Sequence, residues 1–159
     1  MEYIFQVGPS RTATTLQFQI LCALTRIKFP NKSIECVHGR GSLFFRKDGS
    51  KSSEYNHTKD NKKRRDIVVL KSHDIMFSNH LRGFVNKINS YFFMTSGRNS
   101  RAEKKLKNTI KPILIVDRTL VEKKGSDILD EYIPFFGLSE KQADPVKKYL
   151  DVWTTMRYL

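Results

Sequence analysis

Cysteine is scarce in this chain, and long apolar runs are missing from it. The 159 residues include two cysteines, Cys22 and Cys36, which are too few for a disulfide framework. No apolar segment approaches the roughly 20 residues that span a membrane. The N-terminus also lacks the basic and then apolar segments of an export signal. We therefore expect a cytoplasmic protein with reduced thiols and no membrane span.

Acidic residues are also few beside the basic ones. Lysine and arginine total 29 against 16 aspartates and glutamates, which gives a formal net charge of +13. Such an excess favours polyanionic partners, namely a nucleotide, a sulfated or carboxylated glycan, a nucleic acid or an anionic membrane face. The charge does not choose among these partners. The length fits one domain with a substantial core.

Two common kinds of site have no support in the sequence. Gly8 does not begin a Gly-x-Gly-x-x-Gly motif, so we do not expect a dinucleotide-binding fold. The histidines do not combine with the cysteines in any spacing used for zinc, and we expect no metal. These histidines are His38, His57, His73 and His80.

Segments that predict strands alternate with segments that predict helices. The expected strands cover 3–7, 33–37, 66–71, 91–95 and 113–117, and the expected helices cover 14–26, 75–88, 100–108, 126–135 and 140–157. The runs at 67–70 and 113–116 are typical of strands buried on both faces. Asp144 followed by Pro145 has the pattern of a helix start. The alternation predicts one α/β domain over 1–159, with three α/β/α layers around a parallel sheet of about five strands.

The most informative segment is Gly8-Pro9-Ser10-Arg11-Thr12-Ala13-Thr14-Thr15-Leu16. A strand that turns through small and hydroxyl residues into a helix can hold a phosphate on the amides at the positive helix end. The usual ATP or GTP loop places a glycine and a lysine where Ala13 and Thr14 stand here. The basic residue instead lies inside the loop, as Arg11. The alternative is a plain turn whose helix is capped by Thr14 or Thr15.

This loop resembles the 5′-phosphosulfate-binding loop of the sulfotransferase family, Pro-x-(Lys/Arg)-(Ser/Thr)-Gly-Thr-Thr-x-Leu. The chain departs from it at Ala13, where the family has glycine. The residues that match are Pro9, Arg11, Thr12, Thr14, Thr15 and Leu16. The resemblance implies that the loop binds 3′-phosphoadenosine 5′-phosphosulfate. The implied binding residues are Ser10, Arg11, Thr12, Ala13, Thr14 and Thr15.

A second motif, Lys71-Ser72-His73, follows the apolar run at 67–70. Open α/β sheets bind their ligands at such carboxyl strand ends, and Lys71 and His73 would point to the same side. The lysine can neutralise an anion while the histidine accepts a proton. The segment resembles the Lys-Thr-His element of cytosolic-type sulfotransferases, which implies that Lys71 contacts the sulfuryl group and that His73 is the general base. The alternative is a structural histidine at a strand end.

A third motif, 91–98, is an apolar strand that ends in Arg98. It resembles the next strand of the family, whose arginine binds the 3′-phosphate with a two-pronged guanidinium. The family has a serine eight positions later, where this chain has Leu106. Ser100 and Asn99 are the alternatives for that role. A surface arginine after a strand is the simpler interpretation of Arg98.

The segments 113–118 and 128–138 also resemble the late strand, the helix and the Phe-Leu-Gly-Leu corner of the family. Together the resemblances span about 3–156 and imply a sulfotransferase that moves a sulfuryl group to an acceptor hydroxyl or amine. Arg11, Lys71 and His73 would be the catalytic residues. The chain lacks the C-terminal Gly-x-x-Gly-x-Trp-Lys loop of the family, and an inactive relative is a further interpretation. The acceptor is not identified by the sequence, although the charge suggests an anionic one such as a glycan.

A basic insertion at 39–65 interrupts the α/β alternation, with nine lysines and arginines against three acidic residues. Its composition predicts a mobile, solvated loop. The alternative is a basic lid that recruits an anionic acceptor through Phe44, Phe45 or Tyr55.

Two other functions compete with the sulfotransferase hypothesis. A P-loop nucleotide-binding protein or kinase would need an acidic magnesium ligand, for which Asp117 is the candidate. A non-enzymatic nucleic-acid-binding protein is favoured by the net charge and by the basic cluster at 62–65, although no reading motif is present.

Overall fold

A single parallel sheet forms the centre of the protein. The computed structural model describes residues 2–9, 12–38, 65–72, 89–97, 100–119 and 126–158. Every pairing between neighbouring strands of the sheet is parallel. In spatial order the strands are β2 (Ile34–His38), β3 (Ile67–Ser72), β1 (Glu2–Val7), β4 (Asn89–Ser96) and β5 (Leu114–Asp117). The predicted α/β fold with about five parallel strands is confirmed.

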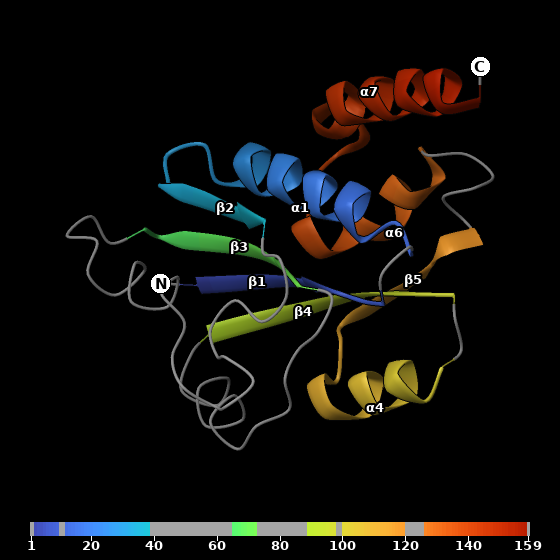
Figure 1. Ribbon diagram of the computed structural model, residues 1–159. Helices are drawn as coiled ribbons and strands as arrows, with labels where there is room; N and C mark the ends of the chain where they lie inside the picture. The colour runs from blue at the N-terminus through green and yellow to red at the C-terminus, as the bar shows by residue number, and fades with distance from the viewer. Residues whose placement is uncertain are drawn as a thin grey trace.

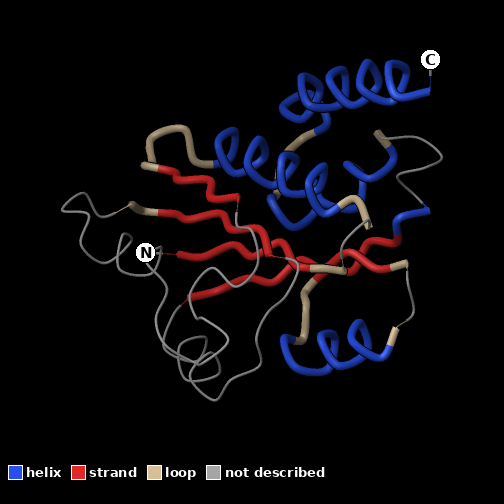
Figure 2. The backbone as a smooth tube through the Cα atoms, in the orientation of Figure 1, coloured by secondary structure: helices blue, strands red, loops and turns tan. Residues whose placement is uncertain are grey.

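Helices cover both faces of this sheet (Figure 1). One face carries α1 (Thr14–Lys28), α6 (Asp127–Phe136) and α7 (Glu140–Tyr158), and the opposite face carries α4 (Arg101–Ile110). The backbone trace in Figure 2 has the same three layers, as the sequence predicted. The helix expected at 75–88 lies outside the described residues, as does 39–64 of the basic insertion. None of the described helices is long and apolar enough to cross a membrane.

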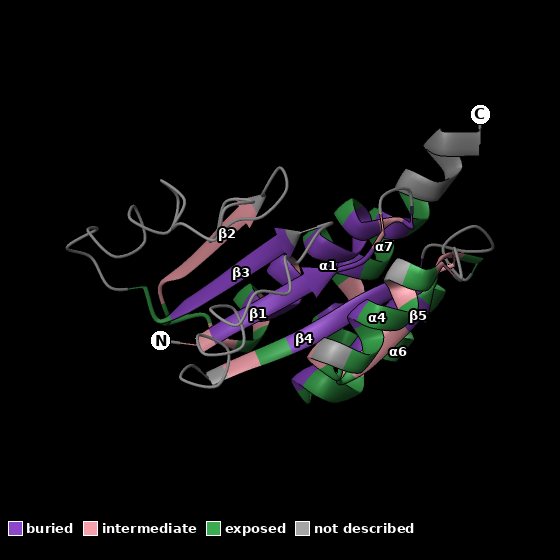
Figure 3. Cartoon of the chain, turned by 60° about the horizontal axis from the view of Figure 1, so that its bottom comes forward, coloured by how far each residue is buried: buried purple, intermediate pink, exposed green. Residues whose placement is uncertain are grey.

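The sheet separates two hydrophobic clusters, one on each of its faces. Successive residues of a strand point to opposite faces and so pack into different clusters. On β1, Ile4 packs beneath α1, α6 and α7, whereas Phe5 packs on the α4 side. There the rings of Phe5 and Phe92 stack with centroids 4.7 Å apart. Figure 3 shows β1 and β3 buried along most of their length, while the edge strand β2 is only half-buried. This two-sided burial explains the continuous apolar run at 67–70.

Helix α7 begins before the position that its proline indicated. Ser139 and Gln142 form a reciprocal cap, in which the Ser139 amide donates to Gln142 Oε1 at 3.0 Å and the Gln142 amide donates to Ser139 Oγ at 3.3 Å. The helix therefore starts at Glu140, and Pro145 lies inside it. The prediction of a helix start at Asp144 and Pro145 was wrong, because this cap sets the boundary one turn earlier.

One buried polar pair joins α1 to α6. The Tyr132 hydroxyl donates a hydrogen bond to Gln17 Oε1, and both residues are fully buried. Gln17 Nε2 has no hydrogen-bond partner among the described residues. A buried polar atom without a hydrogen-bond partner lowers the stability of the folded protein. The packing of α1 against α6 therefore depends on this contact.

Tyr132→Phe is expected to lower the free energy of unfolding by about 1–3 kcal/mol, because it leaves Gln17 Oε1 buried without a donor. Gln17→Leu should cost a similar amount by leaving the Tyr132 hydroxyl without an acceptor. The double variant should recover most of the loss, because no polar atom of the pair remains. Urea unfolding of all four proteins measures this coupling, and strictly additive losses would contradict it.

Candidate phosphate-binding site

The segment after β1 lies at the point where the connections of the sheet change sides. β1 and β4 are neighbours, but α1 follows β1 on one face and α4 follows β4 on the other (Figure 1). In open α/β sheets, ligands bind at the carboxyl strand ends where such a change occurs. The topology therefore places Gly8, Pro9, Thr12 and Ala13 at the position in this fold that most favours a ligand.

Thr12 anchors this segment to β4. Its hydroxyl donates to the carbonyl oxygen of Pro9 at 2.6 Å and lies 2.7 Å from Thr95 Oγ1. Because the single hydroxyl proton of Thr12 is used for Pro9, Thr95 is the donor in the second contact. Thr12 and Thr95 are both fully buried. The hydroxyl of Thr12 thus shapes the segment, and its predicted phosphate contact would come from its backbone amide.

Gly8 passes close to the same strand end. A β-carbon added to Gly8 would lie 2.9 Å from the carbonyl oxygen of Thr95 and 3.0 Å from the methyl group of Thr14. The close approach requires glycine here. Thr95 was not among the residues singled out from the sequence. Its place at the carboxyl end of a predicted strand was a partial signal, but only the structure shows that this strand lies beside β1.

The N-cap residue of α1 provides no side-chain cap. This residue is Ala13, which has left-handed backbone angles (φ 59°, ψ 25°). Thr14 and Thr15 therefore do not occupy the N-cap position and lie in the first turn of the helix. The first turn of α1 also contains no acidic residue. The backbone at Ala13 explains why a glycine suits this position, since a left-handed conformation costs other residues about 1 kcal/mol.

Lys71 brings a positive charge to the start of α1. It is 2% exposed at the carboxyl end of β3, and its Nζ donates to Thr15 Oγ1 at 2.7 Å. Gln6 of β1 is its register partner. Burial lowers the pKa of Lys71 below the ordinary 10.5, because the charged form loses hydration. A buried cation next to the first turn of a helix is a position where an anion would be stabilised strongly.

Several predicted site residues lie outside the described part of the chain, namely Ser10, Arg11, His73 and Arg98. The residues discussed for the missing family serine are in part described. Leu106 is buried in the core beneath α4. Ser100 caps α4, where its Oγ accepts the Glu103 amide at 3.1 Å, and Asn99 is not described. In this contact the Ser100 hydroxyl acts only as an acceptor.

Asp117 is poorly placed as a magnesium ligand for the loop. It ends β5, which β4 separates from β1. Its Oδ1 accepts the amide and hydroxyl of Thr119 at 2.9 and 2.8 Å, and its Oδ2 accepts Ser96 Oγ at 3.3 Å. Hydrogen bonds from Thr119 lower the pKa of Asp117 and fix the carboxylate. Within the described ranges, no three His, Cys, Asp or Glu residues group as a metal site would require.

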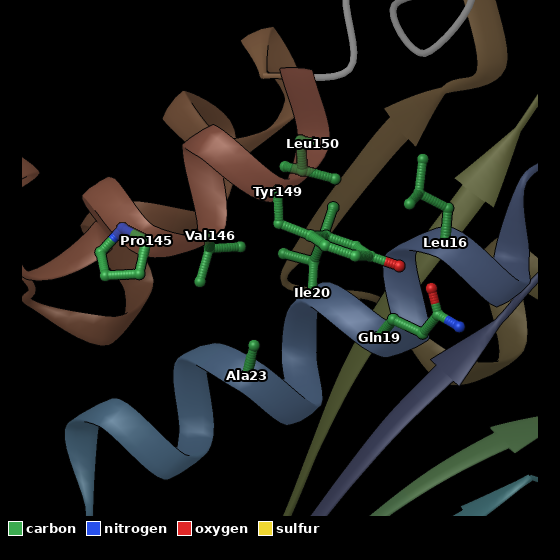
Figure 4. Close-up of a pocket in the computed structure, with 8 residues that line it drawn as sticks. All are labelled: Leu16, Gln19, Ile20, Ala23, Pro145, Val146, Tyr149 and Leu150. Carbon is green, nitrogen blue, oxygen red and sulfur yellow. The ribbon is translucent and has the colours of Figure 1, made fainter. Parts of the chain in front are cut away.

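A separate hollow lies between α1 and α7. Figure 4 shows its lining, which is almost entirely apolar and includes Ile20, Val146 and Leu150. Its volume is about 250 Å³. Because its lining is almost entirely apolar, this hollow is a poor site for a phosphate. The polar groups described above, which could bind a phosphate, lie instead at the carboxyl end of the sheet.

Comparison of the chain with protein-family models and with curated proteins finds no match.

Proposed function

We propose that the protein is a sulfotransferase that binds 3′-phosphoadenosine 5′-phosphosulfate and transfers its sulfuryl group to an acceptor hydroxyl or amine. The observation that carries this proposal is the buried Lys71 side chain, whose ammonium contacts Thr15 in the first turn of α1. The cation comes from a neighbouring strand and not from the helix, as it would in an ATP-binding loop.

The chemistry that this arrangement favours is the transfer of an anionic group. Backbone amides from Ser10 to Thr15, with hydroxyls other than that of Thr12, would hold the 5′-phosphate at the positive end of α1. Lys71 and Arg11 would balance charge on the sulfuryl group and on the bridging oxygen as the S–O bond breaks. Fixed cations can fill the role that magnesium has in phosphoryl transfer.

Two further roles depend on sequence motifs outside the described residues. His73 would accept the proton of the acceptor hydroxyl or amine while that group attacks sulfur in line with the leaving phosphate. Arg98 would bind the 3′-phosphate with its guanidinium fork. The position of Lys71 supports the first role, because His73 follows it by two residues beyond the same strand end.

Adenosine 3′,5′-bisphosphate is expected to bind about tenfold to a hundredfold more tightly than AMP, because a charge-assisted contact to the 3′-phosphate contributes about 1.5–3 kcal/mol. Calorimetric titration of both nucleotides measures this ratio. Arg98→Ala should remove most of the preference while retaining AMP binding.

Equal affinities of the wild-type protein for the bisphosphate and AMP would contradict the proposal. A gain in ATP affinity on adding magnesium would favour a P-loop kinase instead. Binding of DNA or RNA that weakens steeply with salt, in a protein that binds no nucleotide, would favour the nucleic-acid hypothesis. Transfer of labelled sulfuryl from the donor to a panel of anionic glycans, phenols and amines then tests the reaction itself.

A further inference from the structure

A second hollow lies at the amino end of the sheet, at the edge opposite the candidate phosphate-binding site. Its lining includes Glu2, the first residue of β1, and Ile113, which directly precedes β5. The last residues of α1 and α6, Lys28 and Phe136, line it as well. Its volume is about 250 Å³. We call it the amino-end hollow, and it shares no residue with the candidate phosphate-binding site.

Aromatic rings form much of the wall of this hollow. Phe93 is buried, and its ring stacks on that of Phe136 with centroids 6.1 Å apart and meets that of Phe135 edge-on at 6.0 Å. Tyr91 and Phe135 also line the hollow, and they are 40% and 48% exposed. Exposed rings beside a buried one favour a flat aromatic ligand, because such a ligand can stack on them and cover apolar surface.

Two side chains of opposite charge line the same hollow, Glu2 from β1 and Lys28 from the end of α1. Lys28 Nζ lies 3.4 Å from the position that a β-carbon of Gly137 would take, so the ammonium stands beside the C-terminus of α6. Among the described residues, neither Glu2 nor Lys28 forms an ion pair. The hollow therefore offers one anion and one cation to a ligand that carries both signs of charge.

The size of the hollow limits the ligand to a small molecule. An apolar cavity of about 150 Å³ holds a benzene molecule. The amino-end hollow, at about 250 Å³, has room for one such ring and a short polar chain. A contact with another protein is less favoured, because the centres of protein interfaces are depleted of charged residues.

We propose that the amino-end hollow binds a free aromatic amino acid. The ring of the ligand lies among Tyr91, Phe93 and Phe135. Its carboxylate pairs with Lys28, and its ammonium pairs with Glu2. This proposal is independent of the sulfotransferase proposal, because it uses none of the residues at the opposite edge of the sheet.

The test compares phenylalanine with three analogues, by NMR titration of the wild-type chain. 2-Phenylethylamine lacks the carboxylate, 3-phenylpropionate lacks the ammonium, and leucine lacks the ring. Phenylalanine is expected to bind about threefold to tenfold more tightly than each analogue, because each analogue loses one of the three contacts.

Two charge variants assign the two ends of the ligand. Lys28→Met should weaken binding of phenylalanine and 3-phenylpropionate but not of 2-phenylethylamine. Glu2→Gln should weaken binding of phenylalanine and 2-phenylethylamine but not of 3-phenylpropionate. Lys147→Met is the matched control, since it removes the same charge from an exposed position on α7 that does not line the hollow. It should bind all four compounds as the wild type does.

Phe135→Ala removes an exposed ring of the wall and should weaken binding of all three aromatic compounds. Affinity for adenosine 3′,5′-bisphosphate should stay normal in this variant and in both charge variants, because that site lies at the other sheet edge. Failure of wild-type protein to bind phenylalanine at millimolar concentration would overturn the proposal, as would equal affinities for phenylalanine and its analogues. A wild-type dimer that Phe135→Ala disperses would also overturn it, because a second copy of the chain would then cover the hollow.

Discussion

Lys71→Met is expected to weaken binding of adenosine 3′,5′-bisphosphate by about tenfold or more while leaving the protein at least as stable as the wild type. A charge-assisted contact to a phosphate or sulfuryl oxygen contributes about 1.5–3 kcal/mol, which methionine cannot supply. The folded protein, by contrast, gains from the loss of a charge that is 2% exposed. Thr15 loses a hydrogen-bond donor, but this residue is exposed and can turn to water.

This opposition of affinity and stability distinguishes a binding lysine from a structural one. A structural lysine would lower both quantities on replacement, because its contacts would hold β3 against α1. Lys104→Met is the matched control: it removes the same charge from an exposed position on α4 and should change neither property appreciably. Unaltered nucleotide affinity in Lys71→Met would remove Lys71 from the proposed site.

The lowered pKa of Lys71 also predicts a dependence on pH. Between that lowered pKa and the ordinary value of 10.5, the unfolded chain binds a proton at this lysine that the folded chain lacks. The contribution of Lys71 to stability therefore rises with pH across this window, and Lys71→Met should abolish that rise. An anion bound beside Lys71 favours the charged form, so nucleotide binding in the same window should take up a proton. Titration calorimetry in buffers of different ionisation enthalpy measures this uptake.

The sequence predicted the central strands well because they are buried on both faces. The run at 67–70 has no polar interruption and is fully buried, as expected for a strand that helices cover on both sides. The same expectation for 113–116 was wrong, because β5 is an edge strand in which Ile113 is exposed and Leu114 and Ile115 are half-buried. The bounds of α7 were predicted by periodicity, although Pro145 indicated a later start. The reciprocal cap of Ser139 and Gln142 was the stronger signal, because it satisfies two amides at the helix end.

The candidate phosphate-binding site was predictable only in part. Lys71 was found because it ends an apolar strand, and its contact with Thr15 agrees with that position. The contact of Thr12 with Thr95 could not be found, because it depends on which strand lies beside β1. Strand order is set by crossover connections between distant segments and leaves no local pattern in the sequence. The contact of Tyr132 with Gln17 could not be predicted either, because it joins two helices that are far apart in the sequence.

Gly8→Ala is expected to disrupt the phosphate-binding segment and to cost about 1–3 kcal/mol of unfolding free energy, the usual range for overpacking a close contact. The added methyl group would lie 2.9 Å from the Thr95 carbonyl oxygen, so either the segment or the end of β4 must move. That movement would break the hydrogen bond between the Thr12 and Thr95 hydroxyls and displace the backbone amides that precede α1. A displacement of this kind can lower a transfer rate by on the order of 100-fold even where the reacting groups are unchanged.

Gly137→Ala is the control that separates loss of stability from loss of the site. Gly137 follows α6 with a left-handed backbone (φ 57°), and an added β-carbon would meet Lys28 Nζ no closer than 3.4 Å. This variant should therefore lose about 1 kcal/mol through backbone strain while its nucleotide affinity stays normal. If both variants lose stability but only Gly8→Ala loses nucleotide binding, the close approach to Thr95 is what shapes the site. Normal nucleotide affinity in a folded Gly8→Ala protein would contradict the expectation that the close approach of Gly8 to Thr95 shapes the site.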